Sequence, residues 1–235
     1  MRFGKSDKIQ FISTVEGLES IEECLPRPAK HFIPEWFKDI SSHIPMSVKV
    51  CPSFPDYFSQ GYIIPMWSDV ILKNNDQGWE YETGTKLFDW SIHPNHQFIQ
   101  YNNANFLGVE GQFVFKANSP WRIITPPGWS VLQLPLFYHF NQEWSILPGV
   151  IDTDIHHEIN QQVLYHGNGK EVQIKMGDPF VLYIPYKRSN KMKHEIRHNT
   201  IDDVKKFQIG NLIYNGLFHP NGKYRELQRK RDNKN

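Results

Sequence analysis

Two carboxylates stand two residues apart at the end of the segment Leu-Pro-Gly-Val-Ile-Asp-Thr-Asp, which runs from Leu147 to Asp154. Carboxylates can accept protons and bind hydroxyl groups, so Asp152 and Asp154 are the candidate catalytic residues of this chain. The same side chains can instead accept hydrogen bonds from the backbone N–H groups of a turn, as they do in Asx-turns. Both interpretations stay open from the sequence, and Asp152 is the first residue to test by mutation.

Histidines provide a second possible chemistry, which is metal binding. His156 follows Asp154 by two residues, and His93 and His96 are three residues apart. Two histidines and a carboxylate can hold non-haem iron, which would make the chain an oxygenase of the iron and 2-oxoglutarate kind. However, Pro94 prevents an ordinary helix from presenting His93 and His96 together, and Asp154-x-His156 reverses the usual His-x-Asp order. Isolated loop histidines are the simpler interpretation, so we expect no metal and no cofactor.

Aromatic residues and a glycine provide a possible ligand site. Trp121 and Trp129 lie on either side of the turn Thr-Pro-Pro-Gly and could stack on a base or a sugar. Packing inside a sheet explains most of the seven tryptophans without any ligand. Gly149, in the turn before the aspartates, and Asp152 complete the candidate ligand-binding set.

Other catalytic motifs are missing from the sequence. Cys24 and Cys51 are not arranged as a CxxC pair, and no base lies near Cys51, so buried structural thiols are the better interpretation. There is no Gly-x-Ser-x-Gly segment, no P-loop and no Gly-x-Gly-x-x-Gly. These absences argue against a serine hydrolase and against the common nucleotide cofactors.

The elements that position these residues are predicted to be mainly β-strands. Phe, Trp and Tyr make up 14% of the 235 residues, and 16 Pro and 15 Gly indicate frequent turns. The net charge of +1 argues against a protein that mainly neutralises nucleic-acid phosphates. Strand candidates begin at Tyr62–Leu72 and continue at Glu80–Thr83, Lys86–Trp90, Gln97–Tyr101, Gly111–Lys116, Trp121–Thr125, Trp129–Leu134, Gln162–Tyr165, Glu171–Met176 and Phe180–Pro185.

We expect three regions along the chain. Residues 1–60 form an N-terminal extension with short helices packed on the core, residues 61–190 form the β-rich core, and residues 191–235 hold a helix and a basic tail. Asn199 or Thr200 can cap that helix, because Asp202 and Asp203 would lie in its first turn. The tail from Lys223 to Lys234 is either a solvated terminus or a contact arm for nucleic acid or an acidic partner. No signal peptide or membrane-spanning segment is predicted, so we expect a soluble, intracellular protein.

Three motifs in this order give the chain a resemblance to a known superfamily. They are Pro126-Pro127-Gly128-Trp129, then Pro-Gly-Val-Ile-Asp-Thr-Asp, then Gly177-Asp178 before an apolar strand. Together they resemble the core of the dUTPase superfamily, which includes dCTP deaminases, over roughly residues 125–185. The resemblance implies a β-clip fold, and it implies that Asp152 binds a sugar hydroxyl and helps to activate the attacking water.

Several elements of the dUTPase site are absent from this chain. The family's tyrosine, which packs on the deoxyribose, falls on Ile155, and a family glycine falls on His157. The phosphate-binding Arg-Ser-Ser would lie soon after Leu134, where the chain reads Leu-Pro-Leu-Phe-Tyr-His-Phe. The arginine after Gly-Asp is replaced by Pro179, and the glycine-rich arm has no counterpart after Gly216. Phosphoryl chemistry depends on such groups, so dUTP hydrolysis is not expected.

Over most of its length the chain is also similar to proteins of tailed phages, in particular phages of aquatic bacteria and cyanobacteria. The segments that carry this similarity are IPEWFK, GYIIP, PWRIITPPGWSVL and LPGVIDTDI. The similarity implies a location in the cytoplasm of the infected host or in the virion. It predicts a non-catalytic accessory or structural protein that forms a homo-oligomer, a trimer by analogy, or binds other phage proteins. The alternatives are a divergent nucleotide- or sugar-binding enzyme that retains Asp152, or the metal-dependent oxygenase considered above.

Overall fold

The computed structural model describes residues 8–41, 47–49, 51, 53–75, 78–84, 90–92, 113–141, 143–166, 171–189, 193–215, 226 and 230. The chain divides into two compact units. One unit combines Met1–Phe32 with Gly61–Asn190, and the other combines Ile33–Gln60 with Lys191–Asn235. We refer to them as the β unit and the helical unit, and we describe each by itself.

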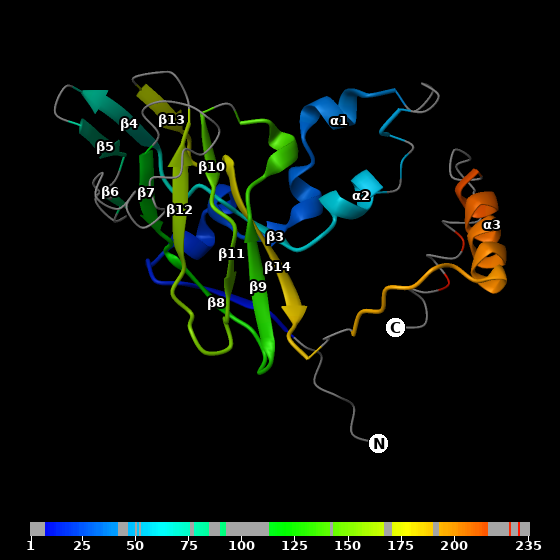
Figure 1. Ribbon diagram of the computed structural model, residues 1–235. Coiled ribbons are helices and arrows are strands. Elements are labelled where there is room, and N and C mark those ends of the chain that lie inside the picture. The colour runs from blue at the N-terminus through cyan, green and yellow to red at the C-terminus, as the bar shows by residue number, and fades with distance from the viewer. Residues whose placement is uncertain are drawn as a thin grey trace. The chain divides into compact units, whose positions relative to one another are not determined.

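The β unit consists of antiparallel sheets (Figure 1). The five-stranded sheet has the order β11 (Gly149–Ile151), β9 (Trp129–Leu134), β14 (Pro179–Lys187), β3 (Tyr62–Pro65) and β2 (Arg27–Pro28). The four-stranded sheet has the order β10 (Trp144–Ile146), β12 (Asn160–Tyr165), β7 (Phe113–Asn118) and β6 (Trp90–Ile92).

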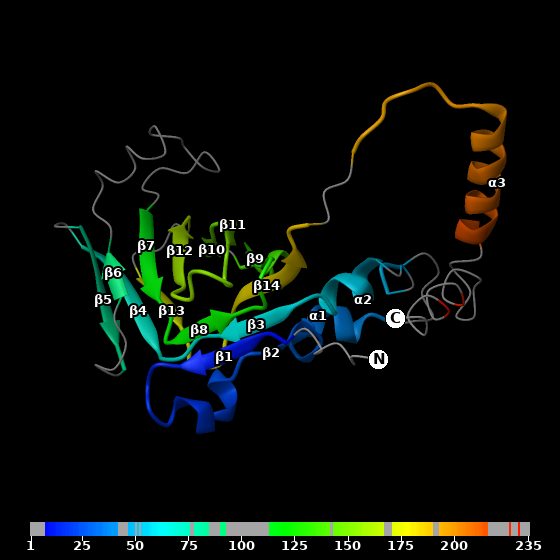
Figure 2. The ribbon, with the colours of Figure 1, turned by 90° about the horizontal axis from the view of Figure 1, so that it is seen from below.

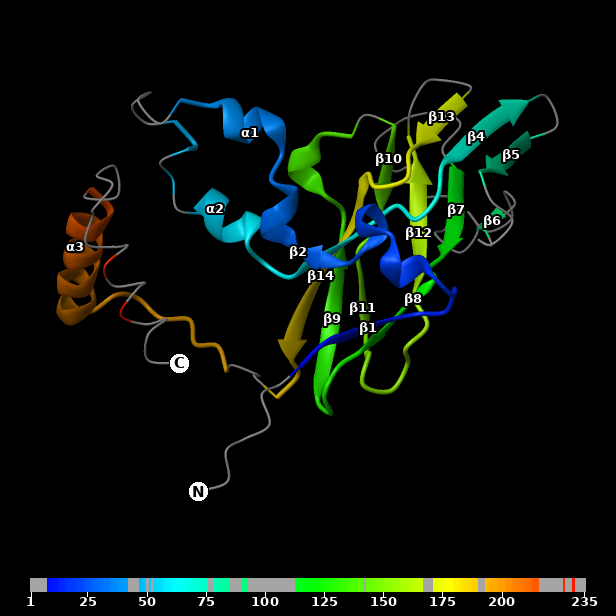
Figure 3. The same cartoon turned by 180° about the vertical axis from the view of Figure 1, so that it is seen from behind.

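Two smaller sheets and four short 3-10 helices complete the described part of the β unit. The three-stranded sheet has the order β13 (Glu171–Ile174), β4 (Val70–Asn75) and β5 (Gly78–Thr83). β1 (Gln10–Ser13) pairs with β8 (Trp121–Ile124), and these strands lie side by side in Figures 2 and 3. The 3-10 helices are η1 (Leu18–Ser20), η2 (Glu22–Cys24), η3 (Ala29–Phe32) and η6 (Phe137–His139).

The burial pattern of the strands follows from their position in the sheets. Along β13 exposed and buried residues alternate, as expected for a strand with one solvated face. β14 lies between β9 and β3, and its residues Phe180 to Tyr183 are all buried. The Phe180 ring packs against Trp67 and Trp144, with ring centroids 5.6 and 5.3 Å away. These aromatic residues all belong to the hydrophobic core of the β unit.

A buried hydrogen-bond network crosses this core. The Tyr183 hydroxyl donates to Gln133 Oε1 over 2.8 Å and accepts a hydrogen bond from Gln161 Nε2 over 3.0 Å. Gln133 Nε2 in turn donates to the Leu147 carbonyl over 3.0 Å. Burial raises the pKa of Tyr183 far above its ordinary value, so the hydroxyl stays protonated. The network therefore joins β14, β9 and β12 through hydrogen bonds between buried side chains, although Gln161 Oε1 has no partner in it.

The helical unit contains α1 (Glu35–Asp39), α2 (Ser53–Phe58) and α3 (Ile201–Asn215). The Phe37 ring of α1 contacts Phe58 of α2 edge-on, with centroids 4.9 Å apart, and Lys49 Nζ lies 4.6 Å from the Phe37 centroid. At the start of α3, Thr200 Oγ1 accepts a hydrogen bond from the Asp203 N–H, and Asp203 Oδ2 accepts one from the Thr200 N–H. This is a capping box, and it confirms the predicted cap at Thr200.

The structure confirms the mainly β class and the C-terminal helix. It also confirms strands at Trp129–Leu134 and within most of the other candidates. The turn at Pro148-Gly149 in the sequence predicts that Val150 and Ile151 enter the core. Ile151 does pack against the core, but the prediction is wrong for Val150, which lies on the edge strand β11 and is 59% exposed. The candidate at Gln97–Tyr101, and all of Lys86–Trp90 except Trp90, lie outside the described residues.

The three regions expected from the sequence stay a prediction. In the two compact units, residues up to Phe32 group with the core and Ile33–Gln60 groups with the C-terminal region. None of the helices among the described residues is both long enough and apolar enough to cross a membrane.

Candidate functional site

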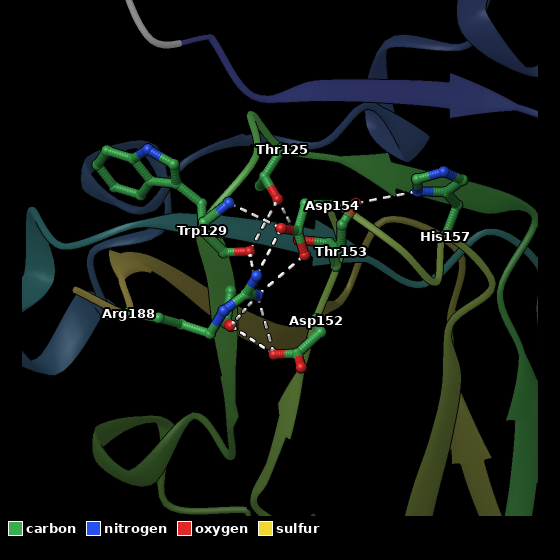
Figure 4. A network of polar contacts seen from close by, with 9 residues as sticks. Thr125, Trp129, Asp152, Thr153, Asp154, His157 and Arg188 are labelled. Atoms are coloured by element: carbon green, nitrogen blue, oxygen red, sulfur yellow. Dashed lines mark hydrogen bonds and ion pairs between the residues drawn. The ribbon is translucent and has the colours of Figure 1, made fainter.

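The two aspartates lie at one end of the five-stranded sheet, beside an arginine from another strand (Figure 4). Asp152 and Asp154 directly follow β11, and Arg188 directly follows β14. β9 lies between these two strands and begins at the same end, because both strands run antiparallel to it. The sheet order therefore brings together residues more than 30 positions apart in the sequence. We call Asp152, Asp154 and Arg188 the Asp–Arg cluster.

Asp154 is enclosed by hydrogen-bond donors. Its Oδ1 accepts from Arg188 Nη1 at 2.9 Å, and its Oδ2 accepts from Arg188 Nη2 at 2.5 Å. Oδ2 also accepts the Gly128 N–H at 2.8 Å, and only 6% of the side chain is exposed. The Arg188 guanidinium, helped by the Gly128 N–H, lowers the pKa of Asp154 to about 2 against the opposing effect of burial. Asp154 is therefore a carboxylate at neutral pH, and both of its oxygens are occupied.

Asp152 is held at one oxygen and more accessible. Its Oδ1 accepts a hydrogen bond from Ser130 Oγ at 2.6 Å and lies 3.1 Å from Arg188 Nη1. About half of the side chain, 51%, is exposed to solvent. Asp152 is thus the member of the Asp–Arg cluster that a ligand could approach.

Arg188 is anchored by more than the two carboxylates. Its Nη1 also lies within 2.9 Å of the Trp129 carbonyl and of Ser130 Oγ, and both accept hydrogen bonds from it. Its backbone N–H donates to the Gly128 carbonyl at 2.9 Å. The hydrogen bond to Asp154 is the largest of the effects that raise the pKa of Arg188, so the guanidinium stays charged.

The turn from Thr125 to Trp129 shapes one side of the Asp–Arg cluster. The Trp129 N–H donates to the Pro126 carbonyl at 3.2 Å, and Gly128 adopts φ +84°, a conformation that glycine takes without strain. Thr125 and Thr153 are both buried, and their hydroxyl oxygens lie 2.7 Å apart (Figure 4). The Pro-Pro-Gly turn and the segment after β11 are therefore bound to each other through Thr153 and Asp154.

The other candidates predicted from the sequence do not gather around the Asp–Arg cluster as a set. Trp129 belongs to it through its backbone, whereas the Trp121 side chain is 2% exposed and is covered by the core. Gly149 pairs with Gln133 within the sheet, and His156 is exposed. These positions leave the ligand-binding roles of Trp121, Trp129 and Gly149 as predictions.

Metal binding has no described site. His93 and His96 lie outside the described residues. Where the structure is described, no group of three His, Cys, Asp or Glu residues is arranged to hold a metal ion. The neighbour of the aspartates, His157, uses Nδ1 for a 2.9 Å hydrogen bond with the Thr153 carbonyl. Asp154 itself is occupied by Arg188 and Gly128, so it could act as a metal ligand only after those bonds break.

Arg188 is the residue of this site that the sequence does not predict. It follows the predicted strand Phe180–Pro185 by three residues, beside Lys187, and no spacing rule links it to aspartates 34 and 36 positions earlier. The strand alternation places Ile184, Tyr186 and Arg188 on the same face, which is the weak signal that was available. Only the fold shows that β9 lies between β11 and β14 and so brings Arg188 to the aspartates.

Comparison with protein-family models and with curated proteins gives no match. A search of solved structures finds dUTPases. The EIAV dUTPase has 13% identity and a TM-score of 0.33, with 60% of this chain and 87% of that chain covered. A mutant dUTPase from phage phi11 of S. aureus has 11% identity and a TM-score of 0.36, and the coverage is 82% and 96%. A mutant dUTPase from Staphylococcus bacteriophage 80alpha has 9% identity and a TM-score of 0.39, and the coverage is 82% and 98%. At such TM-scores these similarities carry no argument about the site.

Proposed function

We propose that this chain is a non-catalytic accessory or structural protein of a phage, built on a β-clip scaffold. The Asp–Arg cluster carries the proposal. Both oxygens of Asp154 and one oxygen of Asp152 already accept hydrogen bonds from Arg188, Gly128 and Ser130. The cluster joins the ends of β11 and β14 to the start of β9, which is the role of a structural clamp.

The geometry of the cluster opposes acid–base chemistry at Asp154. A general base must reach the proton that it removes and must have a free lone pair directed at it. Asp154 is almost fully covered, and the guanidinium of Arg188 favours its ionised, weakly basic form. The hydrogen bonds of Asp154 instead hold three chain segments together, which are the Pro-Pro-Gly turn, the segment after β11 and the end of β14.

The biological part of the proposal rests on the sequence resemblances. We propose that the protein forms a homo-oligomer, a trimer by analogy with β-clip proteins, or binds other phage proteins. Its site of action would be the infected host cytoplasm or the virion. Light scattering of the purified protein measures the oligomeric state, and mass spectrometry of purified virions decides between the two locations.

An assay of dUTP hydrolysis with Mg²⁺ tests the absence of catalysis. We expect no turnover above the blank for the wild-type chain, for Asp152→Asn, or for the matched surface variant Asp39→Asn, whose carboxyl is exposed on α1. Turnover that Asp152→Asn abolishes and Asp39→Asn leaves unchanged, with both variants folded, contradicts the proposal.

A second candidate function is nucleotide or sugar binding at Asp152. One observation favours it, since Asp152 is half-exposed while its neighbour Asp154 is covered. A ligand that binds the folded chain raises its melting temperature, so a thermal-shift series with nucleotides and sugars tests this candidate. Stabilisation of the wild type that Asp152→Asn loses supports it, and the absence of any shift refutes it.

A further inference from the structure

The β unit contains a cavity that is separate from the Asp–Arg cluster. It has a volume of about 400 Å³ and is lined by residues 135–137 and 139–141 after β9, by β10, and by residues at β13 and the start of β14. This volume lies within the roughly 300–1,000 Å³ range of small-molecule sites in proteins. None of Asp152, Asp154 and Arg188 lines it. Because the two places are separate, the inference does not depend on the proposed function.

Aromatic side chains form the rim of this cavity. Phe137 and Phe140 are 67% and 50% exposed, although both are large apolar residues. Their rings and that of Tyr138 contact one another edge-on, with centroid distances of 5.3, 6.4 and 6.2 Å. Phe140 adopts φ +52°, in the left-handed region that bulky residues rarely occupy. The loop thus exposes two phenylalanine rings and contains a strained backbone at Phe140. Backbone strain of this kind is common at sites where a protein binds a ligand.

The charged groups that line the cavity are of one sign. Glu143 and Asp178 contribute two half-buried carboxylates, and neither forms an ion pair within the described part of the chain. One oxygen of Asp178 accepts the Lys175 N–H at 2.9 Å. No lysine or arginine is among the described lining residues. Among the described residues that line the cavity, the negative charge is therefore not neutralised by a lysine or an arginine.

Two histidines, His139 and His166, line the cavity as well. Burial lowers the pKa of His139, and the Phe32 carbonyl opposes this effect only in part, so His139 is neutral at pH 7. His166 Nε2 is hydrogen-bonded to Ser145 Oγ at 2.9 Å. Leu136, Ile146 and Pro179 add apolar walls between these polar groups.

From these contacts we propose that the cavity binds an organic cation with an apolar stem, of the alkyl-guanidinium or alkylammonium class. The carboxylates of Glu143 and Asp178 bind the charged head, because charge-assisted hydrogen bonds are the strongest that a carboxylate makes. The faces of Phe137 and Phe140 attract the same charge through cation–π contacts, and the apolar walls accept the stem. Such a ligand is a free polyamine or a basic side chain on a protein, and the two share this chemistry.

Glu143 is well placed for a decisive variant. Asn141 Oδ1 accepts hydrogen bonds from the backbone N–H groups of Glu143 and Trp144, both at 2.9 Å, so the backbone at Glu143 is held without help from its own carboxylate. Glu143→Gln therefore removes the charge and keeps the shape of the loop. Glu19→Gln is the matched control, because Glu19 is exposed on η1 and does not line the cavity.

NMR titration of the full chain tests the proposal with named probes. N-acetyl-L-arginine amide represents a protein side chain, spermidine represents a free polyamine, and N-acetyl-L-citrulline amide is the neutral isostere of the first. We expect at least one cationic probe to shift the signals of cavity residues and to bind more tightly than the citrulline derivative. The cation that binds more tightly shows whether the ligand is a basic side chain of a protein or a free polyamine.

Glu143→Gln should weaken binding of the cation about tenfold, the change that accompanies loss of one charge-assisted hydrogen bond, while Glu19→Gln leaves it unchanged. Phe137→Ala, at an exposed position, should weaken it several-fold. The proposal is overturned if neither cation binds at millimolar concentration. It is equally overturned if citrulline amide binds as well as arginine amide, or if Glu143→Gln binds as the wild type does while giving a native NMR spectrum.

Discussion

At the scale of single residues, the Asp–Arg cluster holds both Asp152 and Asp154 in ion pairs with Arg188. Asp154 accepts two hydrogen bonds from Arg188 and one from the Gly128 N–H, and the side chain is nearly covered. Asp152 shares the same guanidinium but remains half-exposed. The two aspartates therefore differ in their surroundings even though they stand two residues apart.

The acid dependence of stability follows from the low pKa of Asp154. Its pKa is about 2 in the folded chain and 3.8 in its ordinary environment. The contribution of Asp154 to stability is therefore complete above about pH 4 and is lost as the pH falls through 2. Denaturant unfolding of the wild type at pH 5, 4, 3 and 2.5 should show this loss.

Arg188→Gln should flatten the same pH dependence, because the guanidinium that lowers the pKa of Asp154 is removed. Lys73→Gln is the control, since Lys73 forms an exposed ion pair with Glu82 at 2.8 Å and exposed pairs contribute little. Equal acid sensitivity in Arg188→Gln and in the wild type would show that the Asp154–Arg188 pair does not stabilise the fold.

Tyr183→Phe tests the buried network of the core. The change removes a hydroxyl that binds Gln133 Oε1 and Gln161 Nε2, so it leaves buried amide groups without a partner. We expect a loss of about 1–3 kcal/mol in the free energy of unfolding, measured with denaturant. Tyr81→Phe is the control, because Tyr81 is only partly buried. A loss no larger than that of Tyr81→Phe would be evidence against the network.

At the scale of elements, the end of the five-stranded sheet depends on where its strands begin and end. β11 and β14 finish beside the first residues of β9, and the Asp–Arg cluster lies at that point. The sequence predicts β9 and most of β14, because turn residues border apolar runs there. β10 and β11 have three residues each, too few for a period to be visible, and were not predicted as strands.

The exposed position of Val150 shows why core residues are harder to predict from the sequence than strands. Its apolar side chain follows a turn, which suggests entry into the core. The sheet order makes β11 an edge strand, and Val150 faces solvent there. Local residue patterns do not contain the order of strands in a sheet, so the buried face of a short edge strand cannot be derived from them.

Gly61→Ala tests the close contact between the backbone at Gly61 and strand β14. Gly61 has φ +69°, and a Cβ atom there would lie 2.2 Å from the Tyr183 carbonyl oxygen. Gly17 has φ +84° and open space around its missing Cβ, which makes Gly17→Ala a matched control for backbone strain alone.

In both variants, the left-handed backbone should lower the free energy of unfolding by about 1–2 kcal/mol. In Gly61→Ala, the clash with Tyr183 should lower it by about 1–3 kcal/mol more. The free energies of unfolding of the two variants give the comparison. Equal losses would mean that β14 moves aside at no cost.

At the scale of the whole molecule, the sequence predicts the class of fold better than the site. Composition and turn spacing indicate a mainly β chain, and the capping box at Thr200 marks the C-terminal helix. The aspartates are found from their motif, whereas Arg188 and the acidic cavity depend on long-range contacts. Both features combine residues from several strands, and no local pattern determines which strands meet.

We infer that the Asp–Arg cluster stabilises the fold. A double-mutant cycle of Asp154→Asn and Arg188→Gln tests it in the full chain, with global unfolding as the measured quantity. Tryptophan fluorescence suits the measurement, because six of the seven tryptophans, all except Trp36, belong to the β unit.

We expect each single variant to lower the free energy of unfolding, and the double variant to lose less than the sum of the two. Losses that add without coupling, or single variants as stable as the wild type, would show that the Asp154–Arg188 pair does not stabilise the fold.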